Sequence, residues 1–205
     1  MKNEDLQYIR SQYPDVEDIY TLSPLQKGMM FHNIQSGSGT EYVLQTVYTW
    51  NGILHKDILR QATELLAWQY QVLRTAFVDY RFVSTPLQVV LKDRKIEWNE
   101  HDFTALDEQS QDENMKKLVR EDVERGFDLI DDALMRMDVI QYAQGKYDLI
   151  VTAHHIIMDG WSSSAIIGNL ISLYMKLEKG ISYDELKQEI TAKNQNQSQY
   201  SDYIN

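Results

Sequence analysis

Residues 151–162 (VTAHHIIMDGWS) carry the side chains best suited to chemistry. His154 and His155 end an apolar run, and an Asp159-Gly160 turn and Ser162 follow them. A neutral imidazole accepts or donates a proton near pH 7, so this pair is suited to general base chemistry or to orienting a reacting group. Because successive side chains on a strand point to opposite faces, the two imidazoles cannot both face one cleft. We predict one functional histidine and one structural histidine.

Two other interpretations of this segment stay open. A histidine at the end of a strand is often a core or loop residue without chemistry. Metal binding is a weaker hypothesis, because the spacing differs from that of helical zinc motifs and the segment needs a distant ligand to complete a site. The chain has no cysteine, which excludes a thiolate nucleophile and a disulfide framework. We therefore predict no metal ligands and no cofactor bound by this chain.

The elements that position these side chains are a hairpin and a helix. Alternating apolar residues predict strands over 134–142 and 147–155, joined by a short loop that contains glycine. Further strands are predicted over 42–50, 73–82, 87–91 and 96–98, and helices over 24–36, 56–69, 107–126, 162–180 and 183–190. Residues 5–13 read as a short polar helix or a linker. The mixed order predicts an α/β (α+β) sandwich with a mixed, largely antiparallel sheet flanked by helices.

Composition narrows the class of protein. The chain has 205 residues and a formal net charge of -11, which disfavours binding to nucleic acid or to an anionic membrane. No stretch is apolar and long enough for a membrane span, and the first residues lack the apolar core of a signal peptide. We expect a cytoplasmic location.

Residues 154–160 (HHIIMDG) resemble the HHxxxDG motif of condensation domains of nonribosomal peptide synthetases, in the chloramphenicol acetyltransferase-like superfamily. Residues 20–32 (YTLSPLQKGMMFH) are similar to the first motif of that family, and residues 72–77 (VLRTAF) to the LRTxF part of the second. The three segments stand in the family's order. The resemblance implies the fold of a chloramphenicol acetyltransferase-like lobe.

The chain also departs from the family. The second motif usually reads RHExLRTxF, whereas residues 69–71 here are Gln-Tyr-Gln, so the function of the missing histidine and glutamate is in doubt. Heterocyclisation domains carry an aspartate at the position of His154, which disfavours that subfamily. Later family motifs have no match, and the resemblance implies an N-terminal lobe over residues 15–193. Residues 1–14 then form a linker or helix, and 194–205 a segment that leads toward a C-terminal lobe.

The resemblance implies a role for each motif residue. His155 is the expected catalytic residue, which takes a proton from the attacking amine, positions that amine or stabilises the oxyanion. His154 supports the fold through hydrogen bonds. Asp159 orients His155 or pairs with Arg74 as a structural ion pair, and Gly160 occupies a backbone position that tolerates no side chain, with its amide near the reacting atoms. Trp161 is expected to pack, and Ser162 to cap the helix.

The implied reaction is peptide-bond formation between two thioesters carried by donor and acceptor peptidyl carrier proteins, whose phosphopantetheine arms supply the thiols. The expected partners are those carrier proteins, the C-terminal lobe and neighbouring synthetase domains. The lobe alone is expected to be inactive, since the reaction channel lies between two lobes. The alternatives are a carrier-protein docking or gating lobe without turnover, an epimerisation-type domain, and a stand-alone CoA-dependent acyltransferase.

Overall fold

The computed structural model describes residues 2–195, except for the side chain of Trp161, so the predictions for that side chain and for residues 196–205 lie outside it. Its helices and strands, in chain order, are α1 (Asn3–Gln12), β1 (Val16–Thr21), α2 (Pro24–Ser36), β2 (Val43–Asn51), α3 (Lys56–Gln69), the 3-10 helix η1 (Gln71–Arg74), β3 (Thr75–Phe77), β4 (Leu87–Leu91), β5 (Glu97–Asp102), α4 (Glu108–Arg125), β6 (Met135–Ala143), β7 (Lys146–His154), α5 (Gly160–Glu178) and α6 (Tyr183–Asn194).

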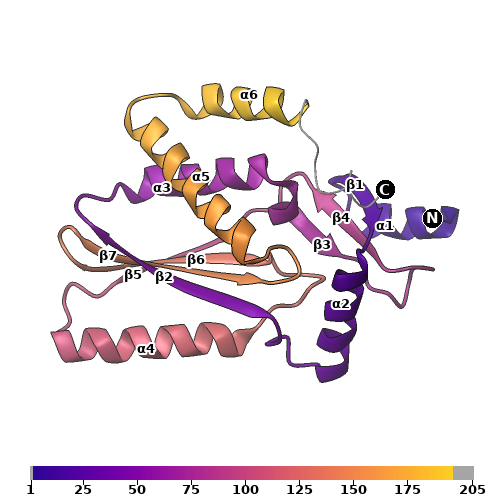
Figure 1. Ribbon diagram of the computed structural model, residues 1–205, viewed down its shortest axis with the longest axis horizontal. Coiled ribbons are helices and arrows are strands. Elements are labelled where there is room, and N and C mark those ends of the chain that lie inside the picture. The colour runs from indigo at the N-terminus through magenta and orange to yellow at the C-terminus, as the bar shows by residue number, and fades with distance from the viewer. Residues whose placement is uncertain (1, 196–205) are drawn as a thin grey trace.

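The larger sheet has the order β2-β7-β6-β5, in which β5 and β6 are parallel and the other neighbours antiparallel. Helices α3 and α5 cover one face and α4 covers the other (Figure 1). The alternation of side chains explains this arrangement, because Leu149, Val151 and Ala153 join the buried core with α3 and α5. Thr152 and His154 therefore point to the α4 face. The predicted mixed, largely antiparallel sheet flanked by helices is confirmed.

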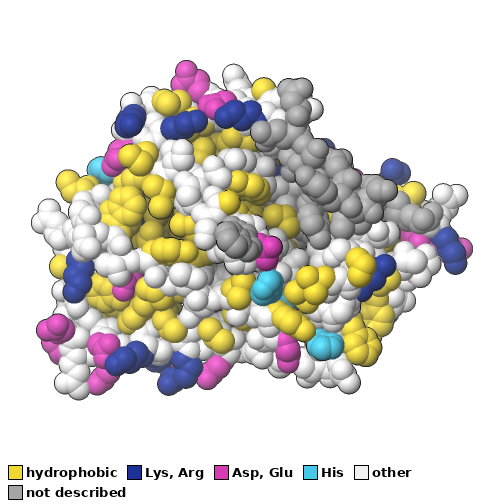
Figure 2. All heavy atoms as spheres, viewed as in Figure 1, with side chains coloured by type: hydrophobic (Ala, Val, Ile, Leu, Met, Phe, Trp, Pro, Cys, Tyr) yellow, Lys and Arg dark blue, Asp and Glu magenta, His cyan; other side chains and the backbone are white. Residues whose placement is uncertain are grey.

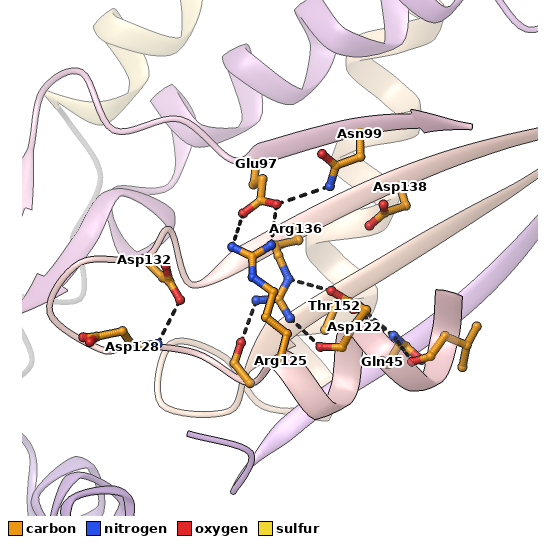
Figure 3. Close-up of polar contacts among 12 residues, drawn as sticks. Gln45, Glu97, Asn99, Asp122, Arg125, Asp128, Asp132, Arg136, Asp138 and Thr152 are labelled. Carbon is orange, nitrogen blue, oxygen red and sulfur yellow. Dashed lines mark hydrogen bonds and ion pairs between the residues drawn. The ribbon is translucent and has the colours of Figure 1, made fainter. Parts of the chain in front are cut away.

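On the sheet face toward α4, polar side chains of the strands form hydrogen bonds and an ion pair with one another and with α4 (Figure 3). Arg136 of β6 is fully buried and donates from Nε to the Asp122 carboxylate at 2.8 Å and from Nη1 to the Gly126 carbonyl at 2.7 Å. Gln45 of β2 donates to the same carboxylate at 2.9 Å and to the Thr152 hydroxyl at 3.1 Å. These bonds attach α4 to the middle of the sheet, on the face that His154 shares.

A smaller sheet, β1-β4-β3, has its own apolar cluster, and Ile9 of α1 is buried in it. Residues 5–13 were expected to form a short polar helix or a linker, and the structure has the helix α1 there. The predicted strand over 73–82 is wrong in its extent, since residues 71–74 form η1 and the strand covers Thr75–Phe77 alone. Strand β1 was not predicted, because its sequence, VEDIYT, is half polar and lacks a clear alternation.

Helix α2 begins at Pro24 as predicted, and Ser23 is its N-cap. The Ser23 hydroxyl accepts from the Gln26 amide at 3.2 Å, and the Gln26 side chain accepts from the Ser23 amide at 3.0 Å. The helix buries Met29 and Met30 and leaves Phe31 exposed. Hydrophobic and histidine side chains gather around α2 on the face shown in Figure 2.

Candidate active site

The hairpin β6–β7 delivers the histidine pair to the edge of the large sheet. His154 is the last residue of β7, and its amide donates to the Leu134 carbonyl at 3.0 Å. The next amide, of His155, donates to the Tyr42 carbonyl at 2.8 Å. The backbone amides of His154 and His155 are therefore held by the residues that directly precede β6 and β2. The chain then turns away from the sheet toward α5.

The His154 imidazole is a buried structural group. Its Nδ1 accepts the Ile156 amide at 3.0 Å, so the neutral ring carries its hydrogen on Nε2, which has no hydrogen-bond partner in the described part of the chain. The Tyr42 and Phe127 rings each lie with centroids 6.1 Å from it. Burial, followed by the charge of His155, lowers the pKa of His154 to about 4, against the opposing influence of Glu41. His154 is neutral at pH 7, as a supporting residue should be.

His155 is partly exposed and lines a hollow of about 270 Å³ between α2 and the turn before α5. The hollow is mainly apolar, with a few polar groups, and its lining residues are Ser23, Leu25, Gln26, Met29, Val72, His155, Ile156, Ile157, Met158, Asp159 and Ser162. An imidazole at the rim of such a hollow meets a ligand without losing its contact with water. The two histidines thus separate in the way that strand alternation predicts.

Gln26 is a residue of this site for which the sequence analysis gave no role. Its side chain is buried and donates to the Ile156 carbonyl at 3.1 Å, while its oxygen accepts from Gln88 of β4 at 3.0 Å. It therefore ties the turn that follows His155 to α2 and to the small sheet. The available signal in the sequence was a glutamine three residues after Ser23, the spacing of a capping box.

Asp159 and Ser162 cap the helix that follows the histidines. The Asp159 side chain accepts from the Ser162 amide at 2.8 Å, and the Ser162 hydroxyl accepts from the Asp159 amide at 2.9 Å. The N-cap is therefore Asp159, and the predicted capping role of Ser162 is confined to the reciprocal half of the capping box, two residues inside the helix. At Gly160 the prediction of a position without room for a side chain is wrong, since an added Cβ would meet nothing within 4 Å in the described structure.

The predicted pairing of Asp159 with Arg74 is also wrong. The buried Arg74 guanidinium donates to the Glu17 carboxylate of β1 at 2.7 Å and to the Leu91 carbonyl at 2.6 Å, and its Nε donates to Ala67 at 2.9 Å. The physical reason is that η1 ends at Arg74 beside β1 and β4, where these acceptors satisfy the charge. Arg74 therefore joins α3 to the small sheet and is not part of the site around His155.

No three histidine, aspartate or glutamate side chains in residues 2–195 are grouped to hold a metal ion. No helix in the same range is long and apolar enough to cross a membrane.

The sequence comparison decides the family. The family model of the condensation domain matches residues 16–205. The chain belongs to the condensation domain family. The likeness includes nonribosomal peptide synthetases: bacitracin synthase 1 of Bacillus licheniformis is 35% identical over 179 residues, 86% of this chain and 3% of that protein. Tyrocidine synthase 2 of Brevibacillus parabrevis is 36% identical over 163 residues, 80% of this chain and 4% of that protein.

Solved structures confirm the condensation-domain fold. The starter condensation domain of rhizomide synthetase aligns with a TM-score of 0.72 at 18% identity, over 81% of this chain and 39% of that chain. A four-domain nonribosomal peptide synthetase bound to AMP and glycine aligns with a TM-score of 0.68 at 17% identity, over 78% of this chain and 12% of that chain. The chain thus spans 39% of a solved condensation domain, which agrees with the resemblance to an N-terminal lobe, and only a few per cent of the curated relatives.

Proposed function

We propose that this chain is the N-terminal lobe of a peptide-bond-forming condensation domain, with His155 as its catalytic residue. The observation that carries the proposal is the separation of the two motif histidines, one sealed in the fold and the other at the rim of a hollow. The substrates are a donor aminoacyl or peptidyl thioester and an acceptor aminoacyl thioester. Each is attached through a phosphopantetheine arm to a peptidyl carrier protein, and the chain itself binds no cofactor.

The attack of the acceptor amine on the donor thioester needs only modest general acid–base catalysis. The α-amino group has a pKa of about 7.7 to 8.0, so much of it is neutral and nucleophilic near pH 8. Its nitrogen attacks the donor carbonyl carbon, the carbon–sulfur bond breaks, and the donor phosphopantetheine leaves as a thiolate. His155 receives the proton that the amine loses and returns it to that thiolate, or it holds the amine by a hydrogen bond while the proton passes through solvent to the thiolate. In either case accurate placement is the larger contribution.

The other motif residues support this geometry. The neutral His154 fixes the turn through the Ile156 amide, and Asp159 caps α5 below the hollow. Gly160 is the first residue of α5, and its amide is a candidate donor to the oxyanion of the tetrahedral intermediate. Arg74 supports the lobe from a distance through Glu17.

A second lobe is part of the proposal. We infer that it supplies the opposite wall of the channel, and that the 205-residue chain alone forms no peptide. The experiment joins the chain to the C-terminal lobe of a relative, adds a donor and an acceptor carrier protein, both loaded, and measures dipeptidyl product. Product from the two-lobed domain and none from the chain alone is expected. Peptide formation by the chain alone would overturn the need for a second lobe.

The same experiment separates the alternative functions. A docking or gating lobe would bind a loaded carrier protein without any product from the two-lobed domain. An epimerisation-type domain would invert the Cα centre of a carrier-bound residue, and a stand-alone acyltransferase would use acyl-CoA and assemble as a trimer. We propose cytoplasmic synthesis together with neighbouring synthetase domains.

A further inference from the structure

Tyr42 is the only non-glycine residue with a left-handed backbone in residues 2–195, with φ at 62°. This conformation brings Cβ too close to the carbonyl oxygen and costs about 1–2 kcal/mol for an ordinary side chain. A bulky residue keeps such a conformation only where the surrounding structure determines it, and such residues cluster at functional sites. Tyr42 directly precedes β2, the strand that pairs with the end of β7.

The structure fixes Tyr42 from both sides in the chain. On the earlier side, the backbones of Gly39 and Gly126 cross so closely that a Cβ on Gly126 would lie 2.4 Å from the Gly39 oxygen. The Phe127 amide donates to that same oxygen at 2.8 Å. On the later side, Val43 pairs with His154 in the sheet. Residues 39 and 43 are therefore held in place, and the turn between them forces the left-handed conformation.

Three parts of Tyr42 contact the candidate active site and α2. Its carbonyl accepts the His155 amide at 2.8 Å. Its ring lies 6.1 Å, centroid to centroid, from the buried His154 ring. Its hydroxyl bonds to Nδ1 of His32 on α2 at 3.0 Å. A single strained residue thus touches both motif histidines and the helix that lines the hollow.

We propose that Tyr42 is a positioning residue that fixes the His155 backbone, seals His154 and couples both to helix α2. This inference rests on the proposed role of His155. The Tyr42 carbonyl binds the His155 amide at the point where the chain leaves the sheet. It therefore fixes the backbone position from which the His155 imidazole reaches the rim of the hollow. The Tyr42 hydroxyl is bonded to His32 of α2, so a movement of α2 also moves Tyr42 and the His155 backbone that it holds.

The environment of His154 offers a readout that does not depend on turnover. Burial is the main reason why the pKa of His154 is about 4, and the charged groups that act on it are His155 and Glu41. The Tyr42 and Phe127 rings both lie beside it. Removal of the Tyr42 ring admits water to His154 and brings its pKa back toward the usual value for histidine.

The test uses nuclear magnetic resonance on the 205-residue chain with labelled histidine. Tyr42→Asn tolerates the left-handed backbone and keeps the carbonyl, but it lacks the ring and the hydroxyl. Tyr42→Phe keeps the ring and lacks only the bond to His32. Phe31→Ala is the matched control, because it removes an exposed ring next to His32 on α2.

We expect Tyr42→Asn to raise the His154 titration midpoint by about one pH unit or more and to speed amide exchange of His155 about tenfold. Tyr42→Phe should shift the His32 ring nitrogen resonances and leave the His154 midpoint in place. Phe31→Ala should leave His154 and His155 unchanged. If Tyr42→Asn has the wild-type His154 midpoint and His155 exchange rate, the proposal is wrong.

If Tyr42→Asn does not fold, Tyr42→Phe tests the proposal. Unchanged His32 ring resonances together with an unchanged rate of His155 amide exchange in Tyr42→Phe would show that Tyr42 does not couple the site to α2. All these readouts use the chain without substrate. A two-lobed His155→Ala domain with full turnover would overturn the proposed function and leave the result on Tyr42 standing, so the two failures are distinguishable.

Discussion

Arg136 of β6 donates to the Asp122 carboxylate of α4 at 2.8 Å, and the arginine side chain is 0% exposed. This ion pair lies on the same sheet face as His154, with Phe127 between them: the guanidinium carbon is 3.9 Å from the centroid of the Phe127 ring, which also contacts His154. The polar side of the sheet is therefore a continuous support beneath the histidine motif.

Removal of one partner of this pair should destabilise the lobe strongly. Asp122→Asn leaves the buried Arg136 charge without its counter-ion, and the expected loss is about 3–5 kcal/mol in the free energy of unfolding. Urea unfolding followed by tryptophan fluorescence measures it. The exposed pair of Lys116 and Asp112 is the matched control, and Asp112→Asn should cost less than about 1 kcal/mol. Equal losses in the two variants would contradict the supporting role of Arg136.

Arg74 and Asp159 should behave as independent sites. Arg74→Met leaves Glu17, Leu91 and Ala67 without their donor and should cost about 3–5 kcal/mol. Asp159→Ala removes a helix cap and should cost about 1 kcal/mol. The double variant should lose the sum of the two values. A coupling energy above about 1 kcal/mol, measured by the double-mutant cycle, would restore the ion pair that the family resemblance implied.

The pKa of His154 predicts a dependence of stability on pH. The native state resists protonation until about pH 4, whereas the unfolded chain binds the proton near the usual 6.5. The unfolded state therefore holds more protons between these values, and stability falls as the pH falls from 6.5 toward 4, by up to roughly 3 kcal/mol. Urea unfolding at each pH measures this slope. His154→Asn keeps an acceptor for the Ile156 amide and should remove most of this dependence of the free energy of unfolding on pH. An unchanged dependence would mean that other groups cause it.

The hairpin and the different burial of the two histidines were predictable from local sequence. Apolar alternation and the Gln144-Gly145 turn define β6 and β7, and period 2 separates His154 from His155. The start of α2 at Pro24 was predicted, and the structure has Ser23 as its N-cap, three residues before the glutamine that completes a capping box. These features depend on neighbours within a few residues.

The wrong ion pair of Arg74 concerns a contact between distant segments. Arg74 and Glu17 are 57 positions apart, and nothing local marks Glu17 as the partner. Residues 71–74 include Val72 and Leu73, which favour a strand by composition, yet the tight turn off α3 makes them a 3-10 helix. The left-handed Tyr42 depends on the Gly39–Gly126 crossing, which brings together loops that the sequence separates by more than eighty residues.

Gln26 should matter for both folding and turnover. Gln26→Leu leaves the Ile156 carbonyl without the Gln26 donor and removes one of the two acceptors of the Gln88 side-chain amide, which keeps its bond to the Thr21 carbonyl at 3.1 Å; the expected cost is about 1–3 kcal/mol. Because the turn after His155 then loses its tie to α2, dipeptide formation by the two-lobed domain should fall more than stability explains. The conservative variant Gln26→Glu keeps an oxygen that accepts from Gln88 but loses the donor to the Ile156 carbonyl, so it should recover part of the stability but not the rate. Recovery of both would make Gln26 a purely structural residue.

The catalytic assignment of His155 is tested most directly by the single-turnover rate of dipeptide formation. The protein is the two-lobed domain with His155→Ala, and both carrier proteins are loaded. We expect the rate to fall by about 100-fold to 10,000-fold while the melting temperature stays within a few degrees of wild type, because His155 is partly exposed. A well-folded His155→Ala domain that forms dipeptide at the wild-type rate would contradict the account.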